Sequence, residues 1–157
     1  MLEMVKVTLP LPAEGVVPHK GRLSLLRNVI AHSSSETVCD VAIDAGSLFH
    51  RNGGVRSWVA LEYMAQAVAA HAGMIARQAG EKPRVGFLLG ARRLELTVPY
   101  FKDGIILHVR AKHLWGEGNL FSFHCDVSLA GSDRPVASAE LNVFRPPDVD
   151  HFLLEEK

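Results

Sequence analysis

The sequence has no excess of charge of either sign, because its 17 Lys and Arg residues balance its 17 Asp and Glu residues. A protein whose main partner is a nucleic acid usually carries a basic surface, so this balance argues against that class of protein. Apolar residues make up 48% of the chain and charged residues 22%, an ordinary globular composition. The 157 residues are predicted to form one domain (residues 1–157), with its core at about residues 16–146.

Cysteine is scarce, and the sequence also lacks the segments that direct a chain to or across a membrane. The two cysteines, Cys39 and Cys125, fall in strand-like runs and are predicted to be buried, reduced thiols. The N-terminal region does not combine a charged stretch with a long apolar run, as a secretory signal does. The most apolar stretch is interrupted by Glu62, Gln66 and His71, so no run reaches transmembrane length. We therefore expect a cytoplasmic protein.

The chain does contain one long, mostly apolar stretch, and the rest of the fold is expected to form around it. Residues 58–79 include eight alanines and are predicted to form a helix, with Ser57 as its N-cap and Gly80 at its end. A helix that is apolar on nearly every side belongs inside a protein rather than on its surface. The sequence therefore predicts one central, buried helix.

Glu62 is the one formal charge between Trp58 and Ala76. A carboxylate buried without a partner is costly, so its presence in a helix that is expected to be buried indicates a function. His50 lies twelve positions earlier, in the glycine-containing loop that leads into the helix. These two side chains are the first candidates for a reactive pair.

Strand-like runs flank the helix on both sides. They lie at residues 23–30 and 36–44 before it, and at residues 85–96, 105–113, 120–129 and 135–144 after it, with turns at 115–119 and 130–134. Short turns favour antiparallel neighbours. One apolar helix against one antiparallel sheet is an α+β architecture in which the sheet wraps the helix. Because such a sheet has an open edge, we expect a dimer with a continuous sheet.

Five short motifs resemble those of a known family. They are PHKGR at residues 18–22, LFH at 48–50, EYMAQ at 62–66, GFLLGA at 86–91 and VPYFKDG at 98–104. In these motifs, and in the order of helix and strands, the chain resembles the 3-hydroxyacyl-(acyl carrier protein) dehydratases of the hotdog fold. The resemblance is greatest to the dehydratase-like branch associated with aryl polyene pathways, and it extends over nearly the whole chain.

The resemblance implies a function and a site. His50 corresponds to the catalytic histidine of the family and Glu62 to its catalytic acid, and in the family these two meet across a dimer interface, one from each subunit. The implied reaction converts a 3-hydroxyacyl thioester into a trans-2-enoyl thioester in fatty acid or polyene biosynthesis. The substrate arrives on acyl carrier protein, so the carrier is the expected partner, and the dimer is a homodimer or a heterodimer with a related dehydratase.

This reaction suits the residues present. It needs a base for the C2 proton, which a neutral His50 supplies, and an acid for the departing hydroxyl, which Glu62 supplies. Free backbone N–H groups at the start of the helix, near Ser57 and Trp58, are expected to hold the thioester oxygen. Gln66, one turn after Glu62, is expected to support it by a hydrogen bond. No metal or organic cofactor is required, since phosphopantetheine arrives on the carrier.

Two other functions remain open at this point. A hotdog thioesterase would use Glu62 to activate water against the thioester carbonyl. A non-catalytic subunit would bind the carrier or complete a heterodimeric dehydratase. The presence of both His50 and Glu62 argues against the non-catalytic subunit without excluding it.

Basic residues accumulate after the helix, in a chain that has no net charge. Residues 77–93 carry five Lys and Arg residues against a single acid, Glu81. One interpretation is a docking patch for an acidic carrier protein, formed by Arg84, Arg92 and Arg93. The other is an ordinary solvated surface.

Overall fold

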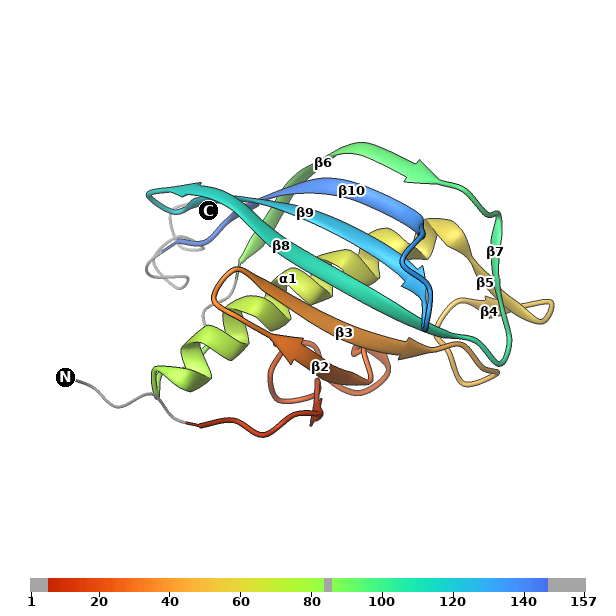
Figure 1. Cartoon of the computed structure of the whole chain (residues 1–157), viewed down its shortest axis with the longest axis horizontal. Coiled ribbons are helices and arrows are strands. Elements are labelled where there is room, and N and C mark those ends of the chain that lie inside the picture. Colours follow the sequence, from red (N-terminus) through yellow and green to blue (C-terminus); the bar gives the residue numbers. More distant parts are fainter. Residues whose placement is uncertain (1–5, 84–85, 147–157) are drawn as a thin grey trace, which may run out of the picture.

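The computed structural model describes residues 6–83 and 86–146, in which one long helix lies against an antiparallel sheet that curves around it (Figure 1). The helix is α1 (Ala60–Gln78). The main sheet has seven strands in the order β1-β2-β3-β8-β9-β10-β6. Their bounds are β1 (Leu11–Pro12), β2 (Asn28–His32), β3 (Glu36–Ala42), β6 (Phe87–Leu96), β8 (Ile106–Glu117), β9 (Leu120–Leu129) and β10 (Pro135–Phe144). The α+β hotdog architecture predicted from the sequence is confirmed.

A second, smaller sheet lies at the end of the molecule where the helix begins (Figure 1). It consists of β4 (His50–Arg51), β5 (Gly54–Arg56) and β7 (Tyr100–Lys102), in the order β4-β5-β7. The sequence predicted only a loop at β4 and β5 and a connection at β7. The strands are too short to show an apolar alternation, so periodicity could not reveal them.

The structure confirms the predicted C-terminal end of the helix but not its predicted start. Gly80 has a positive φ of 70°, and Glu81 N–H donates to Ala76 O at 2.8 Å, which ends the helix as predicted. At the other side Ser57 is not the N-cap, so that prediction was wrong. A short 3-10 helix, η2 (Ser57–Val59), comes first, and the N-cap of α1 is Val59, with no side-chain cap bond.

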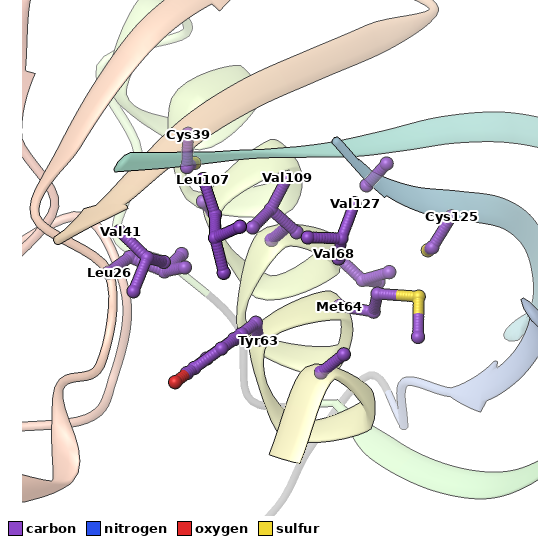
Figure 2. Packing of buried hydrophobic residues seen from close by; sticks show 14 of the residues in the cluster. Leu26, Cys39, Val41, Tyr63, Met64, Val68, Leu107, Val109, Cys125 and Val127 are labelled. Carbon is purple, nitrogen blue, oxygen red and sulfur yellow. The ribbon is translucent and has the colours of Figure 1, made fainter. Parts of the chain in front are cut away.

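The core lies between the helix and the inner face of the main sheet. Met64 and Val68 project from the helix toward Val109 and Val127 of the sheet (Figure 2), and all four side chains are buried. The helix also packs closely on residues 13–17, where a Cβ added to Gly73 would lie 2.1 Å from a backbone oxygen of that segment. Only glycine allows this approach. The helix therefore packs against the main sheet on one side and against residues 13–17 on another.

The helix is buried over most of its length, as predicted, but not on every side. The side chains of Trp58 and Ile75 are 53% and 44% exposed, and Glu62 is exposed as well. The sheet of one chain covers only part of the helix, and the long strand β6 forms an open edge of the sheet. Leu94 and Leu96 of β6 are 42% and 37% exposed. Large apolar side chains left uncovered in this way indicate a surface that another chain covers.

Two smaller predictions had different outcomes. The turn expected at residues 115–119 is present but shorter, at residues 118–119, because β8 continues to Glu117 and Trp115 pairs with Ser122 of β9. Cys39 and Cys125 are buried free thiols, as predicted. Burial raises the pKa of Cys39 to about 12, so this thiol is unreactive. No helix in the described residues is long and apolar enough to cross a membrane.

Candidate active site

His50 is held at the end of a series of turns. Asp44 Oδ1 accepts the backbone N–H of Gly46 at 2.8 Å, and Ser47 O accepts the backbone N–H of His50 at 3.1 Å. The His50 ring contacts a carboxylate that the sequence analysis did not consider, with Nε2 at 2.8 Å from Asp103 Oδ1. The His50 side chain is 19% exposed. The imidazole is therefore held in place while a part of it stays accessible.

Glu62 lies in the first turn of α1 and is supported by Gln66, as the sequence predicted. Gln66 Nε2 donates to Glu62 Oε1 at 3.4 Å and more closely, at 2.7 Å, to the backbone oxygen of Leu23. Gln66 Oε1 accepts the backbone N–H of Leu25 at 2.9 Å. The amide of Gln66 is thus fixed by two backbone groups, which leaves it in a constant position beside the Glu62 carboxyl.

A cavity of about 440 Å³ begins at Glu62 and follows one face of the helix. Its walls are mainly apolar and aromatic. They include Ala65, Ala69, Ala72 and Ile75 of the helix and Leu88, Phe121, Phe123 and Val143 of the sheet. A volume of this size, with mainly apolar walls and some polar groups, is typical of sites that bind small organic molecules. The cavity suits an apolar chain whose reactive end lies at Glu62.

His50 is not among the residues that line this cavity. Within one chain, the ring of His50 contacts Asp103 and the carboxyl of Glu62 contacts Gln66. The described residues therefore do not bring the two predicted catalytic side chains together in a single chain. Both lie close in sequence to the exposed start of the helix, where a second chain could complete a site.

The two backbone groups predicted to bind the thioester oxygen differ in the structure. The N–H of Ser57 donates to Pro99 O at 3.1 Å, so it is not free, and this part of the prediction does not hold. Trp58 follows in the first turn of η2, where N–H groups have no acceptor within the helix. The exposed Trp58 ring lies 5.6 Å from that of Phe49, between ring centroids. Trp58 thus remains the candidate donor.

A chain of buried and half-buried polar side chains meets the wall of the cavity, and sequence reasoning missed it. Thr37 Oγ1 lies 2.7 Å from Nδ1 of both His32 and His71, and His32 Nε2 lies 3.2 Å from Gln78 Oε1. His71 lines the cavity. Burial, and then the neighbouring His32 and His113, lower the pKa of His71 to about 4. These residues come from β2, β3 and α1, so no single spacing in the sequence connects all four of them.

The low pKa of His71 predicts a loss of stability in mild acid. The ordinary histidine pKa is 6.5, so below that pH the unfolded chain takes up a proton that the folded chain refuses until about pH 4. His71 alone should lower the free energy of unfolding by roughly 2 kcal/mol between pH 7 and pH 5. Urea unfolding at the two pH values measures this change.

The control for this prediction is the His71→Gln variant, which has no titrating group at that position. All other groups contribute similarly in both proteins, so the difference between their pH slopes reports on His71. An equally steep slope in the variant would contradict the prediction.

The predicted basic patch can be placed only in part. Arg84 lies outside the described residues. Arg92 pairs with Glu140 across β6 and β10, and Arg93 Nη1 lies 3.7 Å from Glu140 Oε1. The neighbours of Glu140 on β10, Ala139 and Leu141, are buried toward the helix. Arg92 and Arg93 therefore share the outer face of the sheet, beside its open edge.

Comparison with known proteins identifies relatives. A family model described as ApeP-like, ApeP dehydratase, matches residues 11–154. The structure of the dehydratase heterocomplex ApeI:P from Xenorhabdus doucetiae contains a chain that is 27% identical, with a TM-score of 0.82. The match covers 94% of the present chain and 99% of that chain. No curated protein sequence matches.

Thioesterase structures are more distant. A hypothetical thioesterase with coenzyme A from Streptococcus pneumoniae is 12% identical, with a TM-score of 0.59 and coverage of 75% of this chain and 84% of that one. Zebra fish thioesterase superfamily member 2 is 13% identical, with a TM-score of 0.61 and coverage of 85% and 91%. At such low identity these two matches show a shared fold and nothing further.

Proposed function

The chain belongs to the ApeP-like dehydratase family, and from this premise we propose that it dehydrates a 3-hydroxyacyl thioester carried on acyl carrier protein. The product is the trans-2-enoyl thioester, in fatty acid or polyene biosynthesis. The observation that carries the proposal is the cavity that begins at Glu62 and continues along the apolar face of the helix. An acyl chain in this cavity would place its thioester end, with the C2 and C3 atoms, beside the carboxyl of Glu62.

In the proposed mechanism His50 removes the C2 proton and Glu62 gives a proton to the C3 hydroxyl. The C3–O bond breaks, water leaves, and the electron pair from the C2–H bond forms the new double bond. The N–H of Trp58 donates to the thioester oxygen as negative charge develops on it. Gln66 keeps the Glu62 carboxyl in place. The steps are proton transfers and need no metal or organic cofactor; phosphopantetheine is part of the substrate.

The site requires two chains in this scheme, one supplying His50 and the other Glu62. The uncovered helix face and the open edge at β6 support such a dimer. The second chain is an identical copy or a related dehydratase, and the Xenorhabdus doucetiae heterocomplex supports the second of these. In a heterodimer this chain could also serve as a carrier-binding subunit without its own catalytic turnover.

Two assays run side by side test the proposal. The first follows formation of the enoyl thioester by its absorbance, and the second follows release of free thiol from the same substrate. A dehydratase gives the first signal and a thioesterase gives the second. If neither signal appears with this chain alone or mixed with a related dehydratase, the catalytic proposal is wrong. A signal that appears only in the mixture, and that survives loss of both His50 and Glu62 in this chain, identifies a non-catalytic subunit.

We further propose that Arg84, Arg92 and Arg93 attract the acidic carrier protein. The double variant Arg92→Glu, Arg93→Glu should raise the Michaelis constant for carrier-bound substrate. The effect should depend markedly on salt concentration, because dissolved ions screen the attraction between opposite charges. A small soluble thioester should react at close to the wild-type rate, since neither arginine reaches the cavity. Steady-state kinetics on both substrates measures the difference.

The matched control is Arg134→Glu, which reverses an exposed arginine in the turn between β9 and β10. Light scattering on the double variant checks that the assembly is intact, because both arginines lie beside the open edge. Equal losses on the two substrates would assign the arginines to the fold or the site. No loss on either would leave the patch as an ordinary solvated surface.

A further inference from the structure

The carboxylate of Asp103 contacts the ring of His50 although 53 positions separate the two residues, with Oδ1 at 2.8 Å from Nε2. We propose that Asp103 is a positioning residue: it holds the proton of the neutral imidazole on Nε2 and leaves Nδ1 as the nitrogen that accepts the substrate proton. The assignment of the ring proton stands on the contact alone. The role of Nδ1 in turnover rests on the proposed dehydratase function.

The small sheet brings Asp103 to His50 and fixes the distance between their backbones. Asp103 N–H donates to Gly53 O at 3.0 Å, and Gly54 pairs with Lys102. A Cβ added to Gly54 would lie 2.3 Å from Phe101 O, so β5 and β7 can approach this closely only with glycine at position 54. Asp103 directly follows β7, which places its carboxylate at the end of this close contact.

Two further contacts hold the strands of the small sheet together. Tyr100 of β7 donates its hydroxyl to Arg51 O of β4 at 3.1 Å, and so joins the two outer strands. The guanidinium of Arg56 lies 5.6 Å from the centre of the Tyr100 ring. The backbones that carry His50 and Asp103 are therefore connected by hydrogen bonds and by a side-chain contact, and their separation does not depend on the ring contact itself.

The chemistry of the contact fixes the tautomer. An ionised carboxylate can only accept hydrogen bonds, so Nε2 of His50 must carry the hydrogen that points at Asp103. A neutral imidazole has one ring hydrogen, so Nδ1 then has a free lone pair. The side chains are 19% exposed at His50 and 43% exposed at Asp103. Water screens a contact this open, so its effect is on orientation and proton position.

Asp103 does not make the contact expected of an aspartate that only stabilises a turn. It precedes Gly104, whose φ of 89° marks a turn, and a turn aspartate commonly accepts a backbone N–H two residues on. Asp44 does this in the loop before His50, where it accepts Gly46 N–H. In the described part of the chain, the bond that the Asp103 side chain accepts comes from the His50 ring.

Nitrogen-15 NMR of the histidine rings in the full chain tests the proton assignment without any substrate. The His50 signals are assigned from a His50→Gln variant. In the wild type at neutral pH we expect a protonated Nε2 and an unprotonated Nδ1. In Asp103→Ala the two shifts should move toward each other, because the tautomers then exchange. Averaged shifts in the wild type, or identical shifts in the two proteins, would overturn the proposal.

Kinetics tests the role of Nδ1 in turnover. Asp103→Ala should lower kcat roughly tenfold or more with KM changed by less than about twofold, because positioning acts on the chemical step. Asp103→Glu, which keeps a carboxylate, should recover part of the loss. Glu117→Gln removes an exposed carboxylate from the end of β8 and should leave kcat unchanged.

The two levels of the proposal fail separately. A wild-type chain with no dehydratase activity would refute the proposed function, and the ring spectra would still decide the contact. An unchanged kcat in Asp103→Ala beside altered ring shifts would refute the role of Nδ1. A kcat loss that Asp103→Glu does not relieve, together with a lower melting temperature, would assign Asp103 to stability instead.

Discussion

Replacing Glu62 by glutamine is expected to lower the rate of enoyl-thioester formation by at least about a hundredfold, and so is replacing His50 by alanine, since acid–base catalysis contributes on this scale. The Glu62→Gln variant would keep the shape of the side chain and the neighbouring Gln66, but its amide has no proton to give to the leaving hydroxyl. The His50→Ala variant would lack the base. Turnover of carrier-bound substrate at saturation measures both effects.

The protein should remain folded in both variants. Glu62 is exposed in the single chain, and among the described residues the ring of His50 bonds to the exposed Asp103. Near wild-type rates in both variants would refute the assignment of the dehydratase site. A normal rate in one variant would show that the residue replaced there is not needed for the reaction.

A mixture of the two inactive variants tests whether the site is shared between chains. If the protein is a homodimer, a mixed dimer contains one site with both His50 and Glu62 and one site with neither. Random exchange of subunits should then restore about a quarter of the wild-type rate. No recovery after exchange, in a protein shown to be a homodimer, would mean that each chain provides both groups to its own site.

Much of this fold could be predicted because the sequence signals are local. The bounds of β9 and β10 coincide with the predicted runs, and Gly80 ends the helix where its freedom to adopt a positive φ is needed. The predicted hydrogen bond from Gln66 to Glu62 is present because residues four apart on a helix share a face. Each of these features depends on residues within one element.

The parts that could not be predicted depend on which elements meet. The N–H of Ser57 was expected to be free to bind the thioester oxygen, but it is bonded to Pro99 O, which is far along the chain. Glu62 was expected to be buried because its sequence neighbours are apolar. It is exposed because the sheet of one chain does not reach it. The contact between His50 and Asp103 depends on pairing of three short strands, and strands of two or three residues carry no periodic signal.

The exposed leucines at the open edge of β6 lead to the second prediction, which concerns assembly of the dimer. The double variant Leu94→Lys, Leu96→Lys is expected to convert a dimer into a monomer. Leu96 pairs with Ala137, which is buried, so Leu96 faces the helix side of the sheet and is still 37% exposed. Leu94 on the same strand is 42% exposed. Two lysines at this edge would need to be buried without partners on association, which opposes it strongly.

Light scattering at micromolar concentration should give about twice the monomer mass for the wild type and the monomer mass for the variant. Turnover should fall at least about a hundredfold, to the level of the His50 and Glu62 variants, because the site then lacks one of its two groups. The matched control is Leu114→Lys, Leu129→Lys, which changes two leucines that are 46% and 40% exposed on β8 and β9, away from the open edge. This control should keep its mass and its activity. Circular dichroism should show both double variants folded. A wild-type chain that is monomeric and fully active would refute the shared site, and a variant that stays dimeric would place the interface elsewhere than β6.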